Sequence, residues 1–392
     1  MRVETVVAVH NYYQQPGGED QIFAAEGRLL EAHGHRVLRY TTHNDLVRGM
    51  NPLALAWRTI WNGKVYRELR ELLREERPDV VHFHNTFPLI SPAAYYAAKA
   101  EGVPVVQRLP NYRLLCPNAL FLCDGQVCED CLGKPIPWPG VIRRCYRQSL
   151  GATAAVAAML AFHHAMRTWT RKVDLYIALT EFGRDKFVQG GLPADRIVVK
   201  PNFLLHDPGQ ADGCGKYALF VGRLSPEKGL GTLLMAWERL GGDVPLKIAG
   251  DGPLVSKVTE AAGRLPGVEY LGRASKEEVL ALMKDALLLV FPSTWYEGFP
   301  NVIVEAYSVG LPVLSSDLGS MSSLIHHGRT GLHFRPGDPD DLAGQVEWAL
   351  THPHELGRMR REARQEFEQK YTAERNYEML IGIYQEAMES MQ

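Results

Sequence analysis

The sequence predicts an α/β chain of two domains, each built on a parallel sheet with helices around it. Short apolar runs alternate with helix-length segments through the first 200 residues, and this alternation is typical of βαβ units. The same pattern begins again near residue 216. A length of 392 residues also fits two ordinary domains.

The first half contains the elements of one such sheet. The apolar run 3–9 predicts a buried strand, and a helix is expected from about Glu19 to His33, where Gly34 can end it. A further helix, rich in Ala and Tyr, precedes the strand expected at 103–109. The other strands are expected at 36–38, 79–84, 174–179 and 196–199.

The second half predicts another sheet and a helical end. Ser275 and Glu278 have the spacing of a capping box, so a short helix should begin there. Two helices are expected at the end of the chain, at about 354–370 and 373–388. Strands are expected at 216–221, 246–249, 286–291 and 312–314. The stretch 201–215 is rich in Gly, Pro and Asp and is the expected hinge.

The composition excludes several classes of protein. A formal net charge of −2, with 46% hydrophobic and 22% charged residues, is that of a globular protein. It argues against a broad nucleic-acid interface, which needs a strongly basic face. No run approaches the roughly 20 apolar residues of a membrane span, and Met1-Arg2 does not open a secretory signal. We therefore expect a cytoplasmic protein, with contact at the inner face of the membrane left open.

The first motif with chemical content is Gly222-Arg223-Leu224-Ser225-Pro226-Glu227-Lys228-Gly229, which lies between a predicted strand and a helix. Ligands of open parallel sheets bind beyond the carboxyl ends of strands. Arg223 offers a planar fork of donors for phosphate oxygens, and Lys228 offers a compact positive charge. Two fixed cations would stabilise the charge of a departing diphosphate. The alternative is a solvated turn with two surface cations.

The second motif, Glu297-Gly298-Phe299-Pro300-Asn301-Val302-Ile303-Val304-Glu305, follows the next apolar strand. Pro300 fits the first turn of a helix, and the free N–H groups at a helix start bind anions. Gly298 permits close approach of a ligand to the backbone. Glu297 can accept hydrogen bonds from sugar hydroxyls, and Glu305 can accept them from ribose. Alternatively, Glu297 is a turn residue and Glu305 forms an ion pair on an exposed face.

These two motifs, in this order, resemble glycosyltransferase family 4, whose members are retaining enzymes of the GT-B fold with two Rossmann-like domains facing across a cleft. The resemblance covers almost the whole chain and is strongest between Val221 and Val313. It implies an acceptor-side domain at 1–203, a nucleotide-sugar domain at 204–372, and a helix at 373–392 that crosses back to the first domain. It also implies transfer of a hexose-type sugar from a nucleotide-diphosphate donor to a carbohydrate or lipid-linked hydroxyl, as in surface polysaccharide or glycolipid synthesis.

The resemblance assigns a role to each motif residue. Arg223 and Lys228 would bind the diphosphate, Glu297 the transferred sugar, and Glu305 the ribose. The segment around Gly272 would contact the base through its backbone. The donor-binding set that we predict is Gly17, Gly18, Gly222, Arg223, Lys228, Gly272, Arg273, Glu297, Gly298, Phe299, Pro300, Asn301, Val302 and Glu305.

The first domain supplies the remaining candidates. Gly17-Gly18 resembles the glycine loop of the family, which approaches the diphosphate. His84 matches the second His of a His-x-His segment found near the sugar in some relatives, and His82 shares its strand face. A structural role for His84 is the alternative. We predict Arg223, Lys228, Glu297 and His84 as the catalytic residues.

The mechanism implied by the resemblance needs no covalent intermediate. The leaving diphosphate would accept the proton of the acceptor on the same face of the sugar, and catalysis would rest on positioning and charge stabilisation. No Asp-x-Asp metal motif stands out, so a catalytic Mg²⁺ or Mn²⁺ is not implied. We therefore expect that no cofactor is required for catalysis.

A cysteine-rich insert occupies about 110–147, and Cys128-Glu129-Asp130-Cys131 has the spacing of half a zinc site. The segment from Asn111 to Asn118 resembles one found in a subset of the family. In that subset, cysteines tend to match Cys116, Cys128, Cys131 and Cys145, which are thus the predicted ligands of a structural zinc, with Cys123 spare. The alternative is a loop of reduced thiols. Many relatives carry a His where this chain has Pro110, so their acceptor chemistry does not transfer directly.

Two further questions stay open from the sequence. The stretch 142–173 combines six basic residues with an apolar centre, which fits either an interfacial helix at anionic lipid or, the reading we prefer, a helix that covers the first sheet. The activity also has alternatives: a glycosidase using two carboxylates, an epimerase of nucleotide sugars, or a binding module without turnover.

Overall fold

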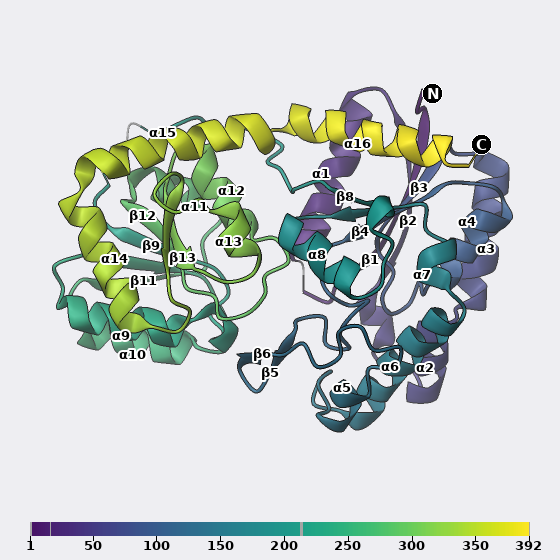
Figure 1. The fold of residues 1–392 in the computed structure, drawn as a ribbon, viewed down its shortest axis with the longest axis horizontal. Helices are drawn as coiled ribbons and strands as arrows, with labels where there is room; N and C mark the ends of the chain where they lie inside the picture. The colour runs from purple at the N-terminus through teal and green to yellow at the C-terminus, as the bar shows by residue number, and fades with distance from the viewer. Residues whose placement is uncertain (1, 16, 212–214, 392) are drawn as a thin grey trace. The chain divides into compact units, whose positions relative to one another are not determined.

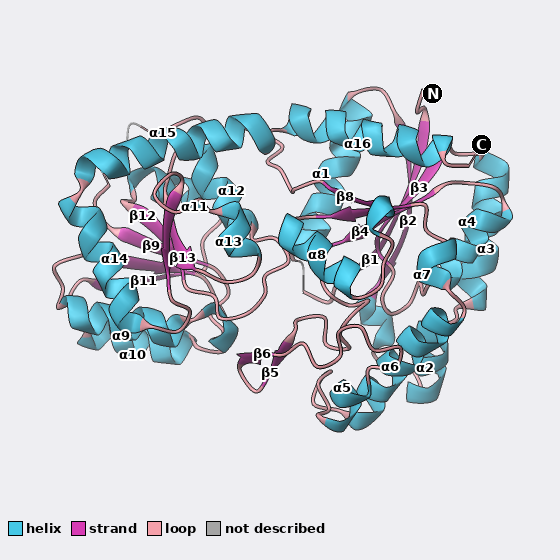
Figure 2. Cartoon of the chain, in the orientation of Figure 1, coloured by secondary structure: helices cyan, strands magenta, loops and turns pink. Residues whose placement is uncertain are grey.

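Two six-stranded parallel sheets organise the chain (Figure 1). The computed structural model describes residues 2–15, 17–211 and 215–391. It divides into two compact units. Unit 1 is Met1–Phe121, Cys128–Pro201 and Ala373–Gln392, and unit 2 is Leu122–Val127 and Asn202–Thr372. Figure 2 shows the strands at the centre of each unit with helices around them.

The sheet of unit 1 has the strand order β2-β1-β3-β4-β7-β8, and every neighbouring pair is parallel. Its central strands are buried on both faces, as is typical of parallel sheets covered by helices, although β3 and β4 also bury polar residues such as His82 and Arg108. The strands are β1 (Thr5–Tyr12), β2 (Arg36–His43), β3 (Val80–Asn85), β4 (Val105–Leu109), β7 (Leu175–Ala178) and β8 (Ile197–Val199).

Helices connect these strands, and several begin at a side-chain cap. In α3, for example, the Asn62 side chain accepts hydrogen bonds from the first-turn N–H groups, and Val65, Leu69 and Leu73 form its buried stripe. The insert contributes a two-stranded hairpin of β5 (Leu122–Cys123) and β6 (Gln126–Val127). The helices are α1 (Gly18–Ala32), η1 (Asn44–Val47), α2 (Pro52–Ile60), α3 (Gly63–Glu76), α4 (Ala93–Ala100), α5 (Trp138–Ile142), α6 (Leu150–Ala165), α7 (Thr168–Arg171), α8 (Glu181–Gln189) and η2 (Ala194–Arg196).

The sheet of unit 2 has the order β11-β10-β9-β12-β13-β14 and is also entirely parallel. Its strands are β9 (Ala218–Val221), β10 (Leu246–Ala249), β11 (Val268–Gly272), β12 (Leu288–Phe291), β13 (Val313–Ser316) and β14 (Gly331–Phe334). Its helices are η3 (Pro226–Lys228), α9 (Leu230–Leu240), α10 (Val255–Arg264), α11 (Lys276–Asp285), α12 (Asn301–Ser308), α13 (Ser320–Leu324), α14 (Pro339–Thr351) and α15 (Pro353–Lys370). The expected capping box of Ser275 and Glu278 is present at α11.

The last helix, α16 (Ala373–Glu389), belongs to unit 1, so the chain does return to its first domain. Leu380, Ile383 and Tyr384 on one face of α16 pack in a core cluster with residues of β1 and β3. The Asn376 side chain also donates a 3.0 Å hydrogen bond to the backbone oxygen of Pro201. Two parallel α/β sheets and a returning helix confirm the predicted fold class.

Candidate functional site

Two loops of unit 2 meet at the carboxyl edge of its sheet. Strand β9 lies between β10 and β12, and the connections from such a central strand leave a crevice outside the sheet edge. The backbone N–H of Thr294, after β12, donates to the backbone oxygen of Glu227, after β9, at 2.9 Å. Gly229 has φ 71°, and a Cβ there would lie 1.8 Å from the oxygen of Pro292. Glycine is therefore required where the two loops touch.

This contact brings the first motif to the second. The Nζ of Lys228 lies 2.6 Å from Oε1 of Glu297, and the glutamate side chain is almost fully buried. The same Lys228 Nζ lies 5.4 Å from the ring centroid of Phe291 and 5.6 Å from that of Trp295, within the range of cation–π attraction. A fixed ammonium group thus stands between a carboxylate and two aromatic rings.

Glu297 is held by two further side chains that the sequence analysis missed. Ser293 Oγ donates to Glu297 Oε1 at 2.6 Å, and Trp295 Nε1 donates to the same oxygen at 2.9 Å. Ser320 Oγ donates to the backbone oxygen of Glu297 at 2.7 Å. Ser293 and Trp295 lie on the loop directly after β12, so their position beyond a strand end was a usable signal. With Lys228, they fix the orientation of the carboxylate.

Glu305 lies in α12, the helix that follows the loop of Glu297. Burial raises the pKa of its carboxyl group above the usual value, and Lys276 opposes this rise. Within the described chain, the Glu305 carboxylate accepts no hydrogen bond, so its oxygens are available to a ligand. Pro300 stands just before α12 instead of in its first turn, and this helix start carries no side-chain cap. Its first N–H groups can therefore face an anion.

The other predicted donor residues line the same edge. Gly222 N–H donates to the oxygen of Ala249, and Gly250 N–H donates to the oxygen of Gly272, which joins the loops after β9, β10 and β11. Arg223 is exposed and forms no ion pair with the described part of the chain. Arg273 is exposed, and the residues of the second motif that are half-buried are Gly298, Phe299, Asn301, Val302 and Glu305.

Gly17 and Gly18 lie in unit 1 at the start of α1. The Gly17 N–H donates to Asp20 Oδ2 at 3.0 Å, and Asp20 Oδ1 lies 2.7 Å from Nε2 of the buried His10. An added Cβ at Gly17 would meet no described atom within 4 Å. The packing of unit 1 alone therefore does not require glycine at this position.

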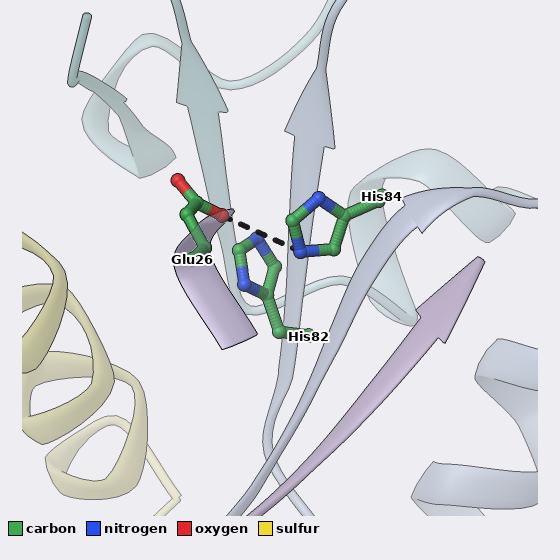
Figure 3. Close-up of side chains that lie close together, drawn as sticks. All are labelled: Glu26, His82 and His84. Atoms are coloured by element: carbon green, nitrogen blue, oxygen red, sulfur yellow. Dashed lines mark ion pairs between the residues drawn. The ribbon is translucent and has the colours of Figure 1, made fainter. Parts of the chain in front are cut away.

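His84 is buried inside unit 1, and Figure 3 shows its ring close to Glu26 and His82. The Nε2 of His84 is 3.4 Å from Oε2 of Glu26, whose other oxygen is 2.6 Å from Nζ of Lys200. His82 Nδ1 is 2.8 Å from the hydroxyl of Tyr384 in α16. These five side chains are all buried. They form the cluster that we call the buried ionic cluster.

The histidines of this cluster are uncharged at neutral pH. Burial lowers the pKa of His82 to about 4, and burial, together with the neighbouring His82 and Arg108, lowers the pKa of His84 well below its usual value. Burial alone would raise the pKa of Glu26, but the attraction of the neighbouring positive charges, chiefly Lys200, outweighs it and lowers the pKa. Glu26 is therefore a carboxylate paired with a lysine.

Glu26, His82 and His84 are the one group of three or more ligand residues, within the described ranges, that could share a metal ion. The charges around these three residues do not favour a bound metal ion. Lys200 already neutralises the single carboxylate, and the Arg108 guanidinium adds positive charge. A divalent cation would meet like charge, which disfavours its binding. The arrangement fits a structural ion pair better than a metal centre.

The cysteines of the insert are all unoxidised thiols in the described chain. The Cys131 thiol is buried, which raises its pKa to about 11, and Cys116 and Cys128 are close enough to contribute. Cys128 Sγ accepts a 3.1 Å hydrogen bond from Arg143. No three of these sulfurs, among the described residues, are as close together as one ion requires. Zinc at Cys116, Cys128, Cys131 and Cys145 stays a prediction.

One Asp-x-Asp triplet is present, at Asp338-Pro339-Asp340. It caps helix α14, because Asp338 Oδ1 accepts hydrogen bonds from the N–H groups of Asp340 and Asp341. Asp340 pairs with Arg239 at 2.9 Å. Both carboxylates thus have structural partners.

Comparison with known proteins identifies the family. The model of the "Glycosyl transferase 4-like domain" matches residues 2–202, more than half of the chain. The model of "Glycosyl transferases group 1" matches residues 205–366. The chain belongs to the glycosyltransferases. The two motifs at the carboxyl edge of unit 2 lie within the group 1 match.

Two curated relatives illustrate the breadth of this glycosyltransferase family. D-rhamnosyltransferase WbpZ of Pseudomonas aeruginosa is 36% identical over 162 residues, which cover 40% of this chain and 42% of WbpZ. The match therefore spans less than half of that relative. Alpha-D-kanosaminyltransferase of Streptomyces kanamyceticus is 26% identical over 375 residues, which cover 92% of this chain and 90% of that protein.

Among solved structures, Anabaena HepE in complex with UDP has a TM-score of 0.69. It is 18% identical and covers 97% of this chain and 98% of its own. At this identity the similarity shows the shared GT-B fold. None of the helices within the described residues of the glycosyltransferase has the length and apolar character to cross a membrane.

Proposed function

We propose that this glycosyltransferase moves a hexose-type sugar from a nucleotide-diphosphate donor to a hydroxyl acceptor, with retention of configuration. The observation that carries the proposal is the meeting of Lys228 and Glu297 at the carboxyl edge of β9 and β12. A cation for phosphate and a carboxylate for sugar hydroxyls lie side by side there. The names of the rhamnosyl and kanosaminyl relatives support a hexose-type sugar.

Each group at this edge has a distinct task in the proposal. Arg223 and Lys228 bind the diphosphate and stabilise the negative charge that grows as the sugar bond breaks. The uncapped start of α12 adds N–H groups to the same anion. Glu305 accepts hydrogen bonds from the ribose. Glu297, whose orientation is fixed by Lys228, Ser293 and Trp295, accepts them from the sugar.

Retention follows if the leaving diphosphate removes the proton of the acceptor on the face it departs from. In this pathway the protein positions the substrates and stabilises the developing charge, and it does not supply a nucleophile. It needs no cofactor, and the acceptor is a carbohydrate or lipid-linked hydroxyl in surface polysaccharide or glycolipid synthesis. His84 would act in this step only if acceptor or sugar reached it beneath the surface of unit 1.

The first test is a thermal-shift screen of the wild type and the Arg223→Ala variant against UDP, GDP, ADP and their common sugars. A nucleotide at about 100 times its dissociation constant should add about 2.7 kcal/mol of stability. We expect one nucleotide to raise the unfolding temperature of the wild type and to lose most of this effect in Arg223→Ala. An exposed cation of unit 2, Lys257, provides the matched control as Lys257→Ala.

The second test is product analysis with the nucleotide sugar that the screen identifies. NMR of the product should show the anomeric configuration of the donor retained. Conversion of the donor sugar without any acceptor would indicate an epimerase, and sugar release from substrates without a nucleotide would indicate a glycosidase. Binding without any turnover would leave a nucleotide-binding module, and any of these three results would refute the proposal.

A further inference from the structure

The exposed apolar side chains of the chain concentrate at one end of unit 1. Twelve large apolar residues stand out as exposed among the described residues, and nine of them lie within 46–57 or 136–166. Leu53 is 82% exposed and Trp57 is 67% exposed. Single exposed apolar residues are ordinary, but a gathering of them marks an interaction site.

These side chains come from elements that pack together. Helix α6 makes its main contacts with α2, α5 and α7, and not with the sheet. Figure 1 shows α2, α5 and α6 side by side at the edge of unit 1. Leu53 and Trp57 are four residues apart, so they lie on one face of α2. Leu150 at the start of α6 and Ile142 at the end of α5 are also exposed.

An apolar groove opens between α2 and the start of α6. It has a volume of about 350 Å³ and a mostly apolar lining that includes Leu53, Ala56, Phe87, Ala152 and Val156. Arg147 also lines it. The groove lies beyond the carboxyl end of β3, because Phe87 follows that strand by two residues. A cavity of this size and lining suits a flexible hydrocarbon chain.

The charge of this region is strongly asymmetric. Residues 131–173 contain seven Lys or Arg and no Asp or Glu. Residues 44–67 contain four Lys or Arg and one acidic residue, Asp45, which pairs with Arg48. The whole chain, in contrast, has a formal net charge of −2. Arg144 and Arg147 are exposed and form no ion pair with described residues. Exposed apolar side chains among unpaired cations are the composition of an interfacial membrane contact.

We propose that η1, α2, α5 and α6 dock unit 1 onto the surface of a bilayer that contains anionic lipid. Leu46, Leu53, Trp57 and Ile142 would enter the boundary between headgroups and acyl chains. Arg144 and Arg147 would lie against lipid phosphates, and the groove would take one acyl chain. Helix α6 buries one stripe, Thr153, Val156, Ala157, Leu160 and His163, against its neighbours, and it leaves Leu150, Phe162 and the following Met166 exposed. The proposal does not depend on the sugar-transfer activity.

The test is co-sedimentation of the full chain with vesicles. One set of vesicles contains phosphatidylcholine alone, and the other contains phosphatidylcholine with phosphatidylglycerol. Two variants remove the two contributions separately: Leu53→Ser with Trp57→Ser, and Arg144→Gln with Arg147→Gln. The matched controls are Met235→Ser with Leu350→Ser, which are exposed apolar residues of unit 2, and Lys257→Gln with Arg361→Gln, which are exposed cations of unit 2.

The wild type should sediment with the anionic vesicles and much less with the neutral ones. Loss of both arginines should weaken partitioning about 30-fold, at roughly fivefold for each charge near the surface, and added salt should imitate this loss. Loss of Leu53 and Trp57 should weaken it by roughly tenfold or more, because two large apolar side chains no longer enter the interface. The control variants should sediment like the wild type.

Folding is checked in every variant by circular dichroism and the thermal midpoint, so that a loss of binding is not a loss of structure. Two results would overturn the proposal. One is a wild type that stays in solution with anionic vesicles. The other is that the variant without Leu53 and Trp57 and the variant without Arg144 and Arg147 both sediment like the wild type. A wild type that binds neutral vesicles equally well would overturn the role given to the arginines. If either variant unfolds, deuterium exchange of wild-type α2 and α6 must slow on anionic vesicles, and unchanged exchange would overturn the proposal.

Discussion

The ammonium group of Lys228 lies 2.6 Å from Oε1 of Glu297, although 69 residues separate them in the chain. Each has its charge balanced by the other at the carboxyl edge of the unit 2 sheet. A diphosphate that binds here would share Lys228 with Glu297, so the lysine can hold the donor without leaving its carboxylate. In the proposed reaction, the pair would therefore link the binding of the diphosphate to the orientation of Glu297, the residue proposed to bind the sugar.

Replacing Lys228 with Met should lower kcat/KM for the donor by roughly 100- to 1,000-fold, because a fixed cation at the developing negative charge is lost. The side chain keeps most of its length, so the two aromatic neighbours should stay packed. Steady-state kinetics with the identified nucleotide sugar measure the effect. The control Lys257→Met removes an exposed cation of α10, and equal kinetics in the two variants would contradict the role of Lys228.

Replacing Trp295 with Phe removes one hydrogen bond to Glu297 and keeps the ring. Because Glu297 would then be less firmly oriented, kcat should fall roughly tenfold, the order expected for a hydrogen bond to a charged group. Binding of the free nucleotide, which carries no sugar, should not change. Calorimetry with the nucleotide and turnover with its sugar separate the two effects. A matched fall in both would place Trp295 in nucleotide binding instead.

Replacing Glu305 with Gln should stabilise the fold and weaken nucleotide binding. Burial raises the pKa of Glu305, so ionisation of this carboxyl group opposes folding. The loss of folding free energy grows as pH rises from the pKa of the unfolded chain to the raised pKa of the folded protein. At neutral pH the Glu305→Gln variant should therefore unfold at a higher temperature than the wild type, and this difference should shrink in acid. Thermal midpoints measured from pH 4 to 8 test the sign.

Nucleotide affinity should move in the opposite direction in the same variant. An amide accepts the ribose hydroxyls less strongly than a carboxylate, so the dissociation constant should rise about tenfold. Glu277→Gln, an exposed position of α11, should alter neither property. A Glu305→Gln variant with lower stability and unchanged affinity would show that Glu305 is a structural residue.

The buried His82 should make the protein sensitive to mild acid. Its pKa of about 4 in the folded state lies below that of an unfolded histidine, so the unfolded chain binds more protons between about pH 6.5 and 4. The contribution of His82 to the free energy of unfolding is fully present above pH 6.5. It falls by about 3 kcal/mol in total as pH drops to about 4. Denaturant unfolding of wild type and His82→Gln across this range measures the difference in slope.

The exposed His354 supplies the control for this experiment. His354→Gln should keep the wild-type dependence on pH, whereas His82→Gln should flatten it. Tyr384→Phe removes the hydroxyl partner of His82 and should lower stability at neutral pH without flattening the slope. An identical slope in wild type and His82→Gln would show that other groups cause the acid sensitivity.

The strands and the donor motifs could be predicted because their signals are local. Four or more apolar residues in a row marked β9 and β12, and the Ser275–Glu278 spacing marked the start of α11. The bonds from Ser293 and Trp295 to Glu297 could not be predicted, since they depend on how the loop after β12 folds over the loop after β9. The spacing of residues along the sequence does not show how these two loops approach each other in the fold.

The burial of His84 escaped the sequence analysis for a related reason. Ligands of open parallel sheets bind beyond the carboxyl ends of strands, and His84 was expected at such an end. However, β3 continues to Asn85, and Glu26 from α1 and Tyr384 from α16 close over the histidine. Neither helix is near His84 in the sequence. The exposed face of α2 was missed as well, because exposure of Leu53 and Trp57 depends on which side of α2 meets α6.

The return of α16 to unit 1 also sets the order in which the protein can be completed during synthesis. Most of unit 1 is translated before unit 2, yet Leu380, Ile383 and Tyr384 of its core and the Asn376 partner of Lys200 are made only after unit 2. Domains generally fold as they leave the ribosome. Here unit 2 can complete its folding before unit 1, because β1, β3 and the buried Lys200 pack against the segment Ala373–Gln392, which is synthesised after unit 2. A chain cut short near its end would thus lose the packing of its beginning.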